Sequence, residues 1–442
     1  MTAMLKELAE GNRIAAEPDP GEFLRRQPVH TVYGGAHLFK ANLVQKFGAI
    51  ALGTLREYAP TPDAFAIALG LDRSLADRVY PRIVDKLTRE PVEDFRIDFE
   101  DGFGNRSDDE EDRVAVSAAR ELADAGTKGA LPPGVGIRIK PLGDEHTLRG
   151  LRTFDLFLTA LLDATGNALP SNFVITLPKI TAPGQVAALA SACDTIEDGR
   201  KLPRGVLRLE IMVETTQSIL AADGTIALPR LVAAGRGRIV AAHFGPYDYT
   251  AACNITSAHQ HTTHPACDFA RHIMQVALAG TGIGLSDGPT NILPIGPHRS
   301  SPDRTLTSAE REENRRIVHR AWRMHADHIR RALASGFYQG WDLHPAQLPA
   351  RYAAVYAFFL EGLDAASERL RHFVEKAGQA TRVRDVFDDA ATGQGLLNHF
   401  LRAMRCGAVG EQEAVEKSGL TIDELRGRSF SKILGARKPR QA

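Results

Sequence analysis

Charged and polar side chains recur along this chain at the points where short apolar runs end. They are Asp98, Glu100, Asp101, Arg138, Lys140, Lys179, Glu214, Asp248, Asp287 and His344. If the apolar runs are parallel strands, their carboxyl ends meet at one face, and these side chains gather there. Carboxylate, guanidinium and ammonium groups around one opening can bind a small acid and stabilise negative charge as it develops. The nearly complete ring favours an active site over a scatter of surface loops.

Glu214 and Asp248 are the best candidates for metal ligands. Both offer hard oxygen atoms, and neither motif contains cysteine or histidine. Such ligands suit Mg²⁺ or Mn²⁺, with water and substrate oxygens completing the coordination. The residues alone leave an alternative open, in which the two carboxylates form salt bridges with Arg138 or Lys179.

Other residues of reactive types match no established site. His259, His261 and His264 lie in a Thr-rich stretch whose spacing fits no zinc motif, so we expect a polar surface loop. Cys253 follows Asp248 but has no evident base, and we interpret it as an inert thiol. The glycines near 33–37 and 279–288 do not form G-x-G-x-x-G between a strand and a helix, so we expect no dinucleotide site.

The elements that must position the ring are short apolar runs that alternate with helical patterns. We predict strands at 29–33, 95–99, 135–140, 173–179, 207–213, 238–244, within 282–293 and at 337–343. A helix is predicted over 109–126, and another over 309–335 with Thr307 and Glu310 as its capping box. Eight strands alternating with helices predict a (β/α)₈ (TIM) barrel of the α/β class.

The barrel is expected over residues 28–364, after an N-terminal extension at 1–27. The Pro/Ser-rich stretch at 294–308 is predicted to be a loop within the barrel, since the strand–helix pattern resumes after it. From about Ala365 onward we predict helices and no strand. Residues 365–442 are therefore expected to form a helical, lid-like appendage that ends in a basic tail.

Composition narrows the classes of function. Among 442 residues, 54 are Lys or Arg and 54 are Asp or Glu, so the formal net charge is zero. Nucleic-acid or anionic-membrane partners normally require a basic excess, and we expect neither. The four cysteines form no C-x-x-C pair, which suits a reducing compartment. No secretory signal or membrane-spanning run is evident, so we expect a cytoplasmic protein.

Six motifs in a fixed order resemble the citrate lyase β-subunit-like superfamily. They are RIDFEDGFGN (96–105), GIRIKPL (136–142), ITLPKIT (175–181), LEIMVETTQSI (209–219), HFGPYDYTAA (243–252) and DLHPAQLP (342–349). This pyruvate/phosphoenolpyruvate-type group includes HpcH/HpaI aldolases and malyl-CoA lyases, with malate synthases as relatives. The resemblance spans roughly residues 28–362. DFED after the second strand, G-x-x-D-Y at 245–249 and FDDAATG at 387–393 lean toward malate synthase.

The resemblance implies roles for particular residues. Glu214 and Asp248 resemble the family's two metal-ligating carboxylates, so Mg²⁺ or Mn²⁺ is the implied cofactor. Arg138 resembles the arginine that contacts the substrate oxygen and stabilises an enolate. Further implied roles are substrate binding by Gly245, Tyr247 and Lys179, positioning of water and the arginine by Glu100 and Asp101, and general acid/base catalysis by Asp389.

Two departures from the family pattern concern the substrate. The first strand leads into Gly34-Gly35-Ala36-His37 instead of a P-A-D-R-type turn, and Pro246 lacks the backbone N–H that would help to bind a carboxylate. The resemblance implies a Mg²⁺-dependent lyase or aldolase for a small 2-oxo or 2-hydroxy acid, free or as a CoA thioester, in a homo-oligomer. The alternatives are a malate-synthase-like condensation and a non-catalytic metabolite-binding barrel. For Asp389, the alternative is that Asp388, Asp389 or Thr392 caps the helix at 395–404.

Overall fold

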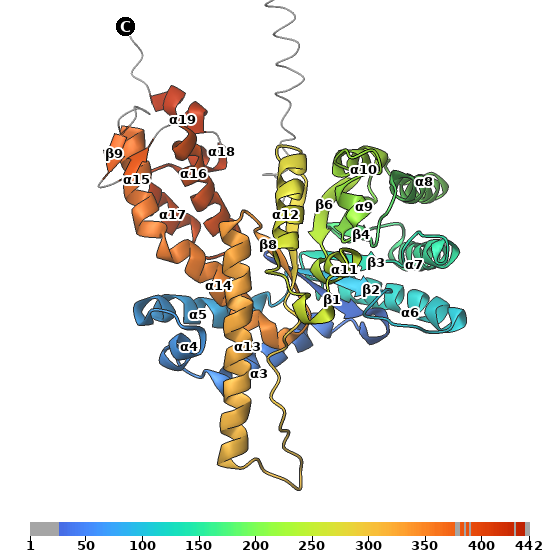
Figure 1. Ribbon diagram of the computed structural model, residues 1–442, viewed down its shortest axis with the longest axis horizontal. Helices are drawn as coiled ribbons and strands as arrows, with labels where there is room; N and C mark the ends of the chain where they lie inside the picture. Colours follow the sequence, from blue (N-terminus) through green and yellow to red (C-terminus); the bar gives the residue numbers. More distant parts are fainter. Residues whose placement is uncertain (1–25, 376–380, 384–385, 389, 428–429, 438–442) are drawn as a thin grey trace, which may run out of the picture. The chain divides into compact units, whose positions relative to one another are not determined.

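The computed structural model describes residues 26–375, 381–383, 386–388, 390–427 and 430–437 (Figure 1). Within them the chain divides into two compact units. The first unit comprises the described residues up to Gly48, Val92–Asn291 and Phe337–His344, and the second comprises Ala49–Pro91, Ile292–Gly336 and the described residues from Pro345 onward. The division suggested by the sequence, into an extension at 1–27, a barrel at 28–364 and an appendage at 365–442, stays a prediction.

Eight parallel strands of the first unit close into a barrel in chain order, β1 pairing with both β2 and β8. They are β1 His30–Gly35, β2 Asp94–Asp98, β3 Gly134–Arg138, β4 Phe173–Leu177, β5 Arg208–Val213, β6 Ile239–Phe244, β7 Gly284–Pro289 and β8 Gln339–Asp342. Each falls within or beside a predicted run. The predicted (β/α)₈ barrel is thereby confirmed.

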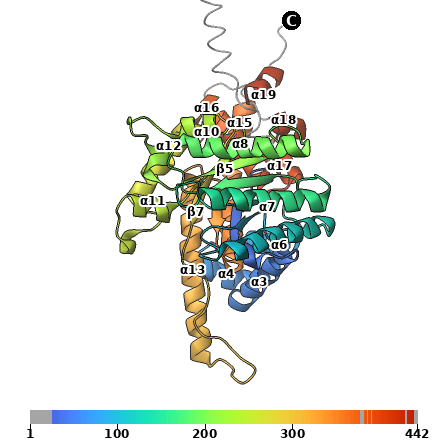
Figure 2. The same cartoon turned by 90° about the vertical axis from the view of Figure 1, so that its right-hand side faces the viewer.

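Helices of the first unit cover the outside of the barrel. They are α6 Asp108–Thr127, α7 Thr147–Thr165, α8 Pro183–Arg200, α9 Thr216–Ile219, α10 Leu228–Ala234, α11 Pro246–Ala252 and α12 Pro265–Leu278, with short 3₁₀ turns η1 Ala36–Leu38 and η2 Ser257–His259. Figure 2 shows α6, α7 and α8 side by side. The sequence favours α6 because the Ser107 hydroxyl accepts from the Glu110 N–H and acidic residues fill its first turn.

The described residues of the second unit are mostly helical. The helices are α4 Pro62–Leu69, α5 Arg73–Arg89, α13 Ser308–Ala334, α14 Leu348–Glu361, α15 Leu363–Glu375, α16 Ala390–Arg405, α17 Glu411–Ser418, α18 Ile422–Gly427 and α19 Phe430–Arg437, with η3 Pro345–Gln347. Helix α3 (Leu43–Tyr58) runs from the first unit into the second. The predicted capping box is confirmed, since Thr307 and Glu310 exchange hydrogen bonds at the start of α13.

One expectation for the C-terminal part is wrong, and one of the alternatives for its helix cap is excluded. Residues Thr381–Val383 (β9) and Val386–Asp388 (β10) form an antiparallel pair where no strand was predicted. Their β-branched and aromatic residues suit strands, but three residues are too few to show a period. Helix α16 begins at Ala390 and already includes Thr392, so Thr392 is not its cap.

The barrel interior carries ion pairs. Arg96 of β2 contacts Glu210 of β5 at 2.5 Å, and because β3 and β4 separate these strands, the contact crosses the interior. Side chains alternate between the two faces of a strand, so Asp94, Arg96 and Asp98 of β2 all point inward. Barrels of this fold usually fill the interior with branched apolar side chains.

None of the described helices is long and apolar enough to cross a membrane.

A substitution at Gly136 of β3 tests how closely β3 and β4 are packed. A Cβ at this position would lie 2.2 Å from the Val174 carbonyl oxygen of the neighbouring strand, and that backbone atom cannot move aside cheaply. We expect Gly136→Ala to lower the free energy of unfolding by about 1–3 kcal/mol. Gly143→Ala is the matched control, since nothing lies within 4 Å of its added Cβ. Equal urea midpoints for the two variants would contradict the strand register.

Candidate active site

Glu214 and Asp248 lie at the carboxyl ends of neighbouring strands. Glu214 directly follows β5 and is 1% exposed, whereas Asp248 lies in the first turn of α11, after β6. Burial and the Asp248 charge raise the pKa of Glu214 to about 8. Gly245 allows this placement, because a Cβ there would lie 2.4 Å from Glu214 Oε2. The structure thus gives Gly245 a steric role beside the substrate-binding role that the resemblance implied.

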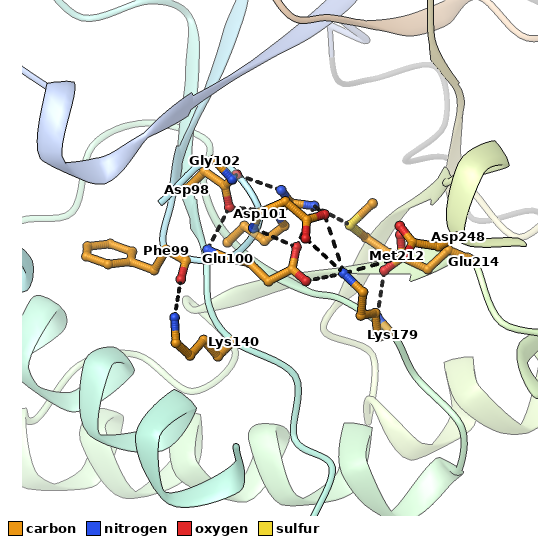
Figure 3. A network of polar contacts seen from close by, with 11 residues as sticks. Asp98, Phe99, Glu100, Asp101, Gly102, Lys140, Lys179, Met212, Glu214 and Asp248 are labelled. Carbon is orange, nitrogen blue, oxygen red and sulfur yellow. Dashed lines mark hydrogen bonds and ion pairs between the residues drawn. The ribbon is translucent and has the colours of Figure 1, made fainter. Parts of the chain in front are cut away.

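Lys179 lies between the acidic groups of the mouth, as Figure 3 shows. Its backbone has φ 48°, in the left-handed region that lysine rarely adopts. In this conformation its N–H donates to Glu214 Oε1 at 2.6 Å, and its Nζ contacts Glu100 and lies 3.8 Å from Asp248 Oδ1. Burial alone would lower the pKa of Lys179, but the charges of Glu100 and Glu214 outweigh burial and raise it. Strain of this kind is often found at functional sites.

Arg138, at the end of β3, is buried and held in one orientation. Its Nε and Nη2 donate to the two carboxylate oxygens of Asp98 at 2.7 and 2.6 Å. Its guanidinium carbon lies 4.9 Å from the centre of the Tyr33 ring and 5.5 Å from that of Trp341. The remaining nitrogen, Nη1, lies 3.1 Å from Glu100 Oε2. The paired oxygens and the two aromatic rings therefore fix which edge of the guanidinium faces the mouth.

The turn after β2 follows from Asp98. Its carboxylate accepts the N–H of Glu100 at 3.0 Å and that of Gly102 at 2.7 Å, so a short acidic side chain folds the backbone that follows it. A Cβ on Gly102 would lie 2.6 Å from Asp98 Oδ2, which explains the glycine. The turn directs Glu100 and Asp101 toward Lys179.

Negative charge exceeds positive charge in this network. It contains five carboxylates and two cations: Asp98, Glu100, Asp101, Glu214 and Asp248 with Arg138 and Lys179. A buried carboxylate whose pKa is raised by a second carboxylate is an arrangement that a divalent cation would stabilise. The donor set therefore fits Mg²⁺ or Mn²⁺. No group of three or more His, Cys, Asp or Glu side chains among the described residues is arranged around a metal position, so water and substrate would complete the coordination.

Several predicted residues lie apart from this network. The Tyr247 hydroxyl donates to the Pro289 carbonyl and accepts the N–H of Asn291, so it fastens the segment around the end of β7. Lys140 donates to the Phe99 carbonyl, and Asp287 pairs with Arg271. His264 caps α12 by accepting from the Ala266 N–H. Asp389 lies outside the described residues.

Sequence reasoning missed the residues that hold Arg138. Asp98 was included in the ring without a role, and Tyr33 and Trp341 were read only as strand residues. A signal existed for Asp98, since it lies two residues after Arg96 and so on the inner face of β2. The aromatic pair could not be assigned, because its contact with Arg138 depends on how β1, β3 and β8 face one another across the interior.

Comparisons with known proteins identify a family and two similar solved structures. A family model described as Domain of unknown function (DUF6986) matches residues 8–433. A citrate lyase from Burkholderia xenovorans LB400 has a similar structure, with a TM-score of 0.56 and 19% identity over 89% of this chain and 97% of that chain. A malate synthase from Haloferax volcanii, as a lead(II) complex, gives a TM-score of 0.47 and 14% identity over 93% and 98%. No curated protein matches the chain. The likeness to citrate lyase confirms the fold that the motifs implied.

Divalent metal binding tests the pair Glu214 and Asp248. We expect Glu214→Gln and Asp248→Asn each to weaken Mn²⁺ binding about tenfold or more in titration calorimetry, because each removes one anionic ligand oxygen. Asp144→Asn and Glu145→Gln are matched controls on the exposed segment after β3. Unchanged affinity in either test variant would rule out that carboxylate as a ligand.

Proposed function

The chain belongs to the family described as Domain of unknown function (DUF6986), so we propose a function from the chemistry of the barrel mouth. We propose a carbon–carbon lyase that depends on Mg²⁺ or Mn²⁺ and acts on a small 2-oxo or 2-hydroxy acid. The main support for the proposal is that Glu214 and Asp248 lie at the same opening of the barrel as the guanidinium of Arg138, which is held in one orientation. The charge excess there favours a cation, and a bound cation together with Arg138 favours an anionic substrate.

The reaction requires an anion to be stabilised at a defined place. In the cleavage, the bond between the α-carbon and the neighbouring hydroxyl-bearing carbon breaks. Its electron pair forms an enolate with the negative charge on the carbonyl oxygen, while the hydroxyl group gives its proton to a base and becomes the carbonyl of the departing fragment. Arg138 Nη1, on the edge not occupied by Asp98, would donate to that oxygen. Asp98, Tyr33 and Trp341 hold the guanidinium in place before the reaction, so little reorganisation is needed as charge develops.

Metal and lysine have separate roles in this proposal. Glu214 and Asp248 would hold the cation, which acts as a Lewis acid on the substrate's carbonyl and carboxylate oxygens. Lys179 holds Glu214 through its backbone N–H, and its ammonium sets the position of Glu100. Glu100 and Asp101 would then orient Arg138 and water at the mouth.

Pyruvate in deuterated water tests the function directly. With Mg²⁺ present, we expect the protein to exchange the methyl protons of pyruvate, because stabilising the enolate makes them acidic. Proton NMR measures the rate. Exchange that needs an acetyl thioester instead of pyruvate would support the condensation reaction, and no exchange with any 2-oxo acid or thioester would favour a binding protein without turnover.

The Arg138→Lys variant tests whether Arg138 acts through its paired hydrogen-bond donors or through its positive charge alone. Lysine keeps the positive charge beside Asp98 but cannot form the forked hydrogen bonds. We expect the exchange rate to fall by roughly 10²-fold while the protein stays folded. Arg238→Lys is the matched control, since Arg238 makes a similar buried fork with Glu197 at 2.6 and 2.7 Å, outside the mouth network. Equal rates for the Arg138 variant and the wild type would exclude the proposed role.

The general acid/base remains Asp389 in our proposal, on the strength of the FDDAATG motif. Glu214 and Asp248 are committed to the cation, which lowers their basicity. We expect Asp389→Asn to abolish exchange and to leave Mn²⁺ affinity nearly unchanged, with Asp388→Asn as the neighbouring control. Exchange at the wild-type rate in Asp389→Asn would place the base elsewhere.

A further inference from the structure

A cavity lies at the opposite end of the barrel from the candidate active site. Its volume is about 560 Å³. The first residue of every strand from β2 to β8 lines it, from Asp94 of β2 to Gln339 of β8, together with residues 26–28 just before β1. The cavity is therefore the amino-terminal mouth of the barrel, and it lies wholly within the first unit.

Buried ion pairs form the floor of this cavity. Arg96 pairs with one oxygen of Asp94 and with both oxygens of Glu210. Thr31 donates to the other oxygen of Asp94, and Thr176 donates to Glu210 Oε2, which it shares with Arg96. Burying charges is expensive, and well-packed apolar residues are often as stable or more stable than a buried ion pair. A polar floor is therefore poorly explained by stability alone. It suits a cavity that receives a polar group from a ligand.

The rim combines apolar side chains with positive charge. Leu169, Pro170, Leu202 and Val206 lie half-buried around the opening. Arg208 is also half-buried there, and the Arg26 side chain is 39% exposed.

The acids of the cavity are nearly inaccessible by contrast. Glu93 is 1% exposed, and Asp94 and Glu210 are buried. Each already accepts hydrogen bonds within the protein, Glu93 from the Val29 N–H and the other two from Arg96. The cations that a ligand meets at this opening are Arg208, which also donates to the Gly237 carbonyl at 3.3 Å, and Arg26, which pairs with Glu93 at 2.9 Å. The rim around them carries the polar Asn167 and Asn172 as well as apolar side chains.

We propose that the amino-terminal mouth binds a small organic anion, in which an apolar or aromatic body carries one carboxylate, sulfonate or phosphate group. The volume falls within the range of pockets that enclose molecules of this kind. The apolar body packs on Leu202 and Val206, and the anionic group pairs with Arg208. This site needs neither the metal nor the reaction proposed for the other mouth.

The probe for the test is 8-anilinonaphthalene-1-sulfonate, which joins an aromatic body to one anionic group. We expect one probe molecule per chain to bind in titration calorimetry, with affinity that falls as salt is added. Arg208→Gln removes the cation, and Leu202→Glu places a negative charge on the rim. Each should weaken binding about tenfold or more. Octanoate should displace the probe, and inorganic sulfate at the same concentration should not.

Two controls keep the result specific. Arg204→Gln removes an exposed arginine from the segment that precedes β5, outside the cavity, and should bind the probe as the wild type does. Glu214→Gln should also bind it normally, so that failure of the proposed lyase function and failure of this site are distinguishable. Thermal unfolding checks that each variant is folded.

Wild-type affinity in both Arg208→Gln and Leu202→Glu would overturn the proposal. So would the absence of probe binding to the wild-type protein. Several weak probe sites per chain, unaffected by either variant, would show adventitious binding and would likewise overturn it.

Discussion

The pair of Arg138 and Asp98 is the interaction on which the geometry of the candidate active site depends. A buried guanidinium needs a partner, and Asp98 provides both carboxylate oxygens. The same oxygens accept the backbone N–H groups of Glu100 and Gly102, which turns the chain so that Glu100 reaches Lys179. Lys179 in turn donates its N–H to Glu214. One sequence of contacts thus connects β2, β3, β4 and the end of β5.

The excess of buried carboxylates over cations at this mouth bears on the function of the site. A carboxyl group as buried as Glu214 is stabilised in its neutral form, and the nearby Asp248 charge strengthens that preference. Lys179 and Arg138 act against it without balancing all the acids. Apolar side chains or a matched number of cations would make a more stable barrel. The proposed divalent cation would offset this excess of negative charge.

The sequence predicted the fold well because strand runs and strand ends are local features. Eight apolar runs and the acids that follow them were enough to place Glu214, Asp248, Arg138 and Lys179 at one mouth. The left-handed backbone of Lys179 could not be predicted, because a lysine gives no local signal for positive φ. Contacts across the interior were missed for another reason, since they depend on how all the strands close. The roles of Asp98, Tyr33 and Trp341 are of this kind.

Alternation along β2 and β5 explains how one barrel can carry charged groups at both ends. Arg96 and Glu210 form the floor of the amino-terminal cavity, and two residues further along the same strands lie Asp98 and Met212. Tyr33, Met212 and Trp341 form a buried cluster in the interior, and Tyr33 is influenced by the charges of both Glu210 and Arg138. Packed aromatic side chains therefore lie between the two charged regions without isolating them, because the low dielectric of the interior screens charge weakly.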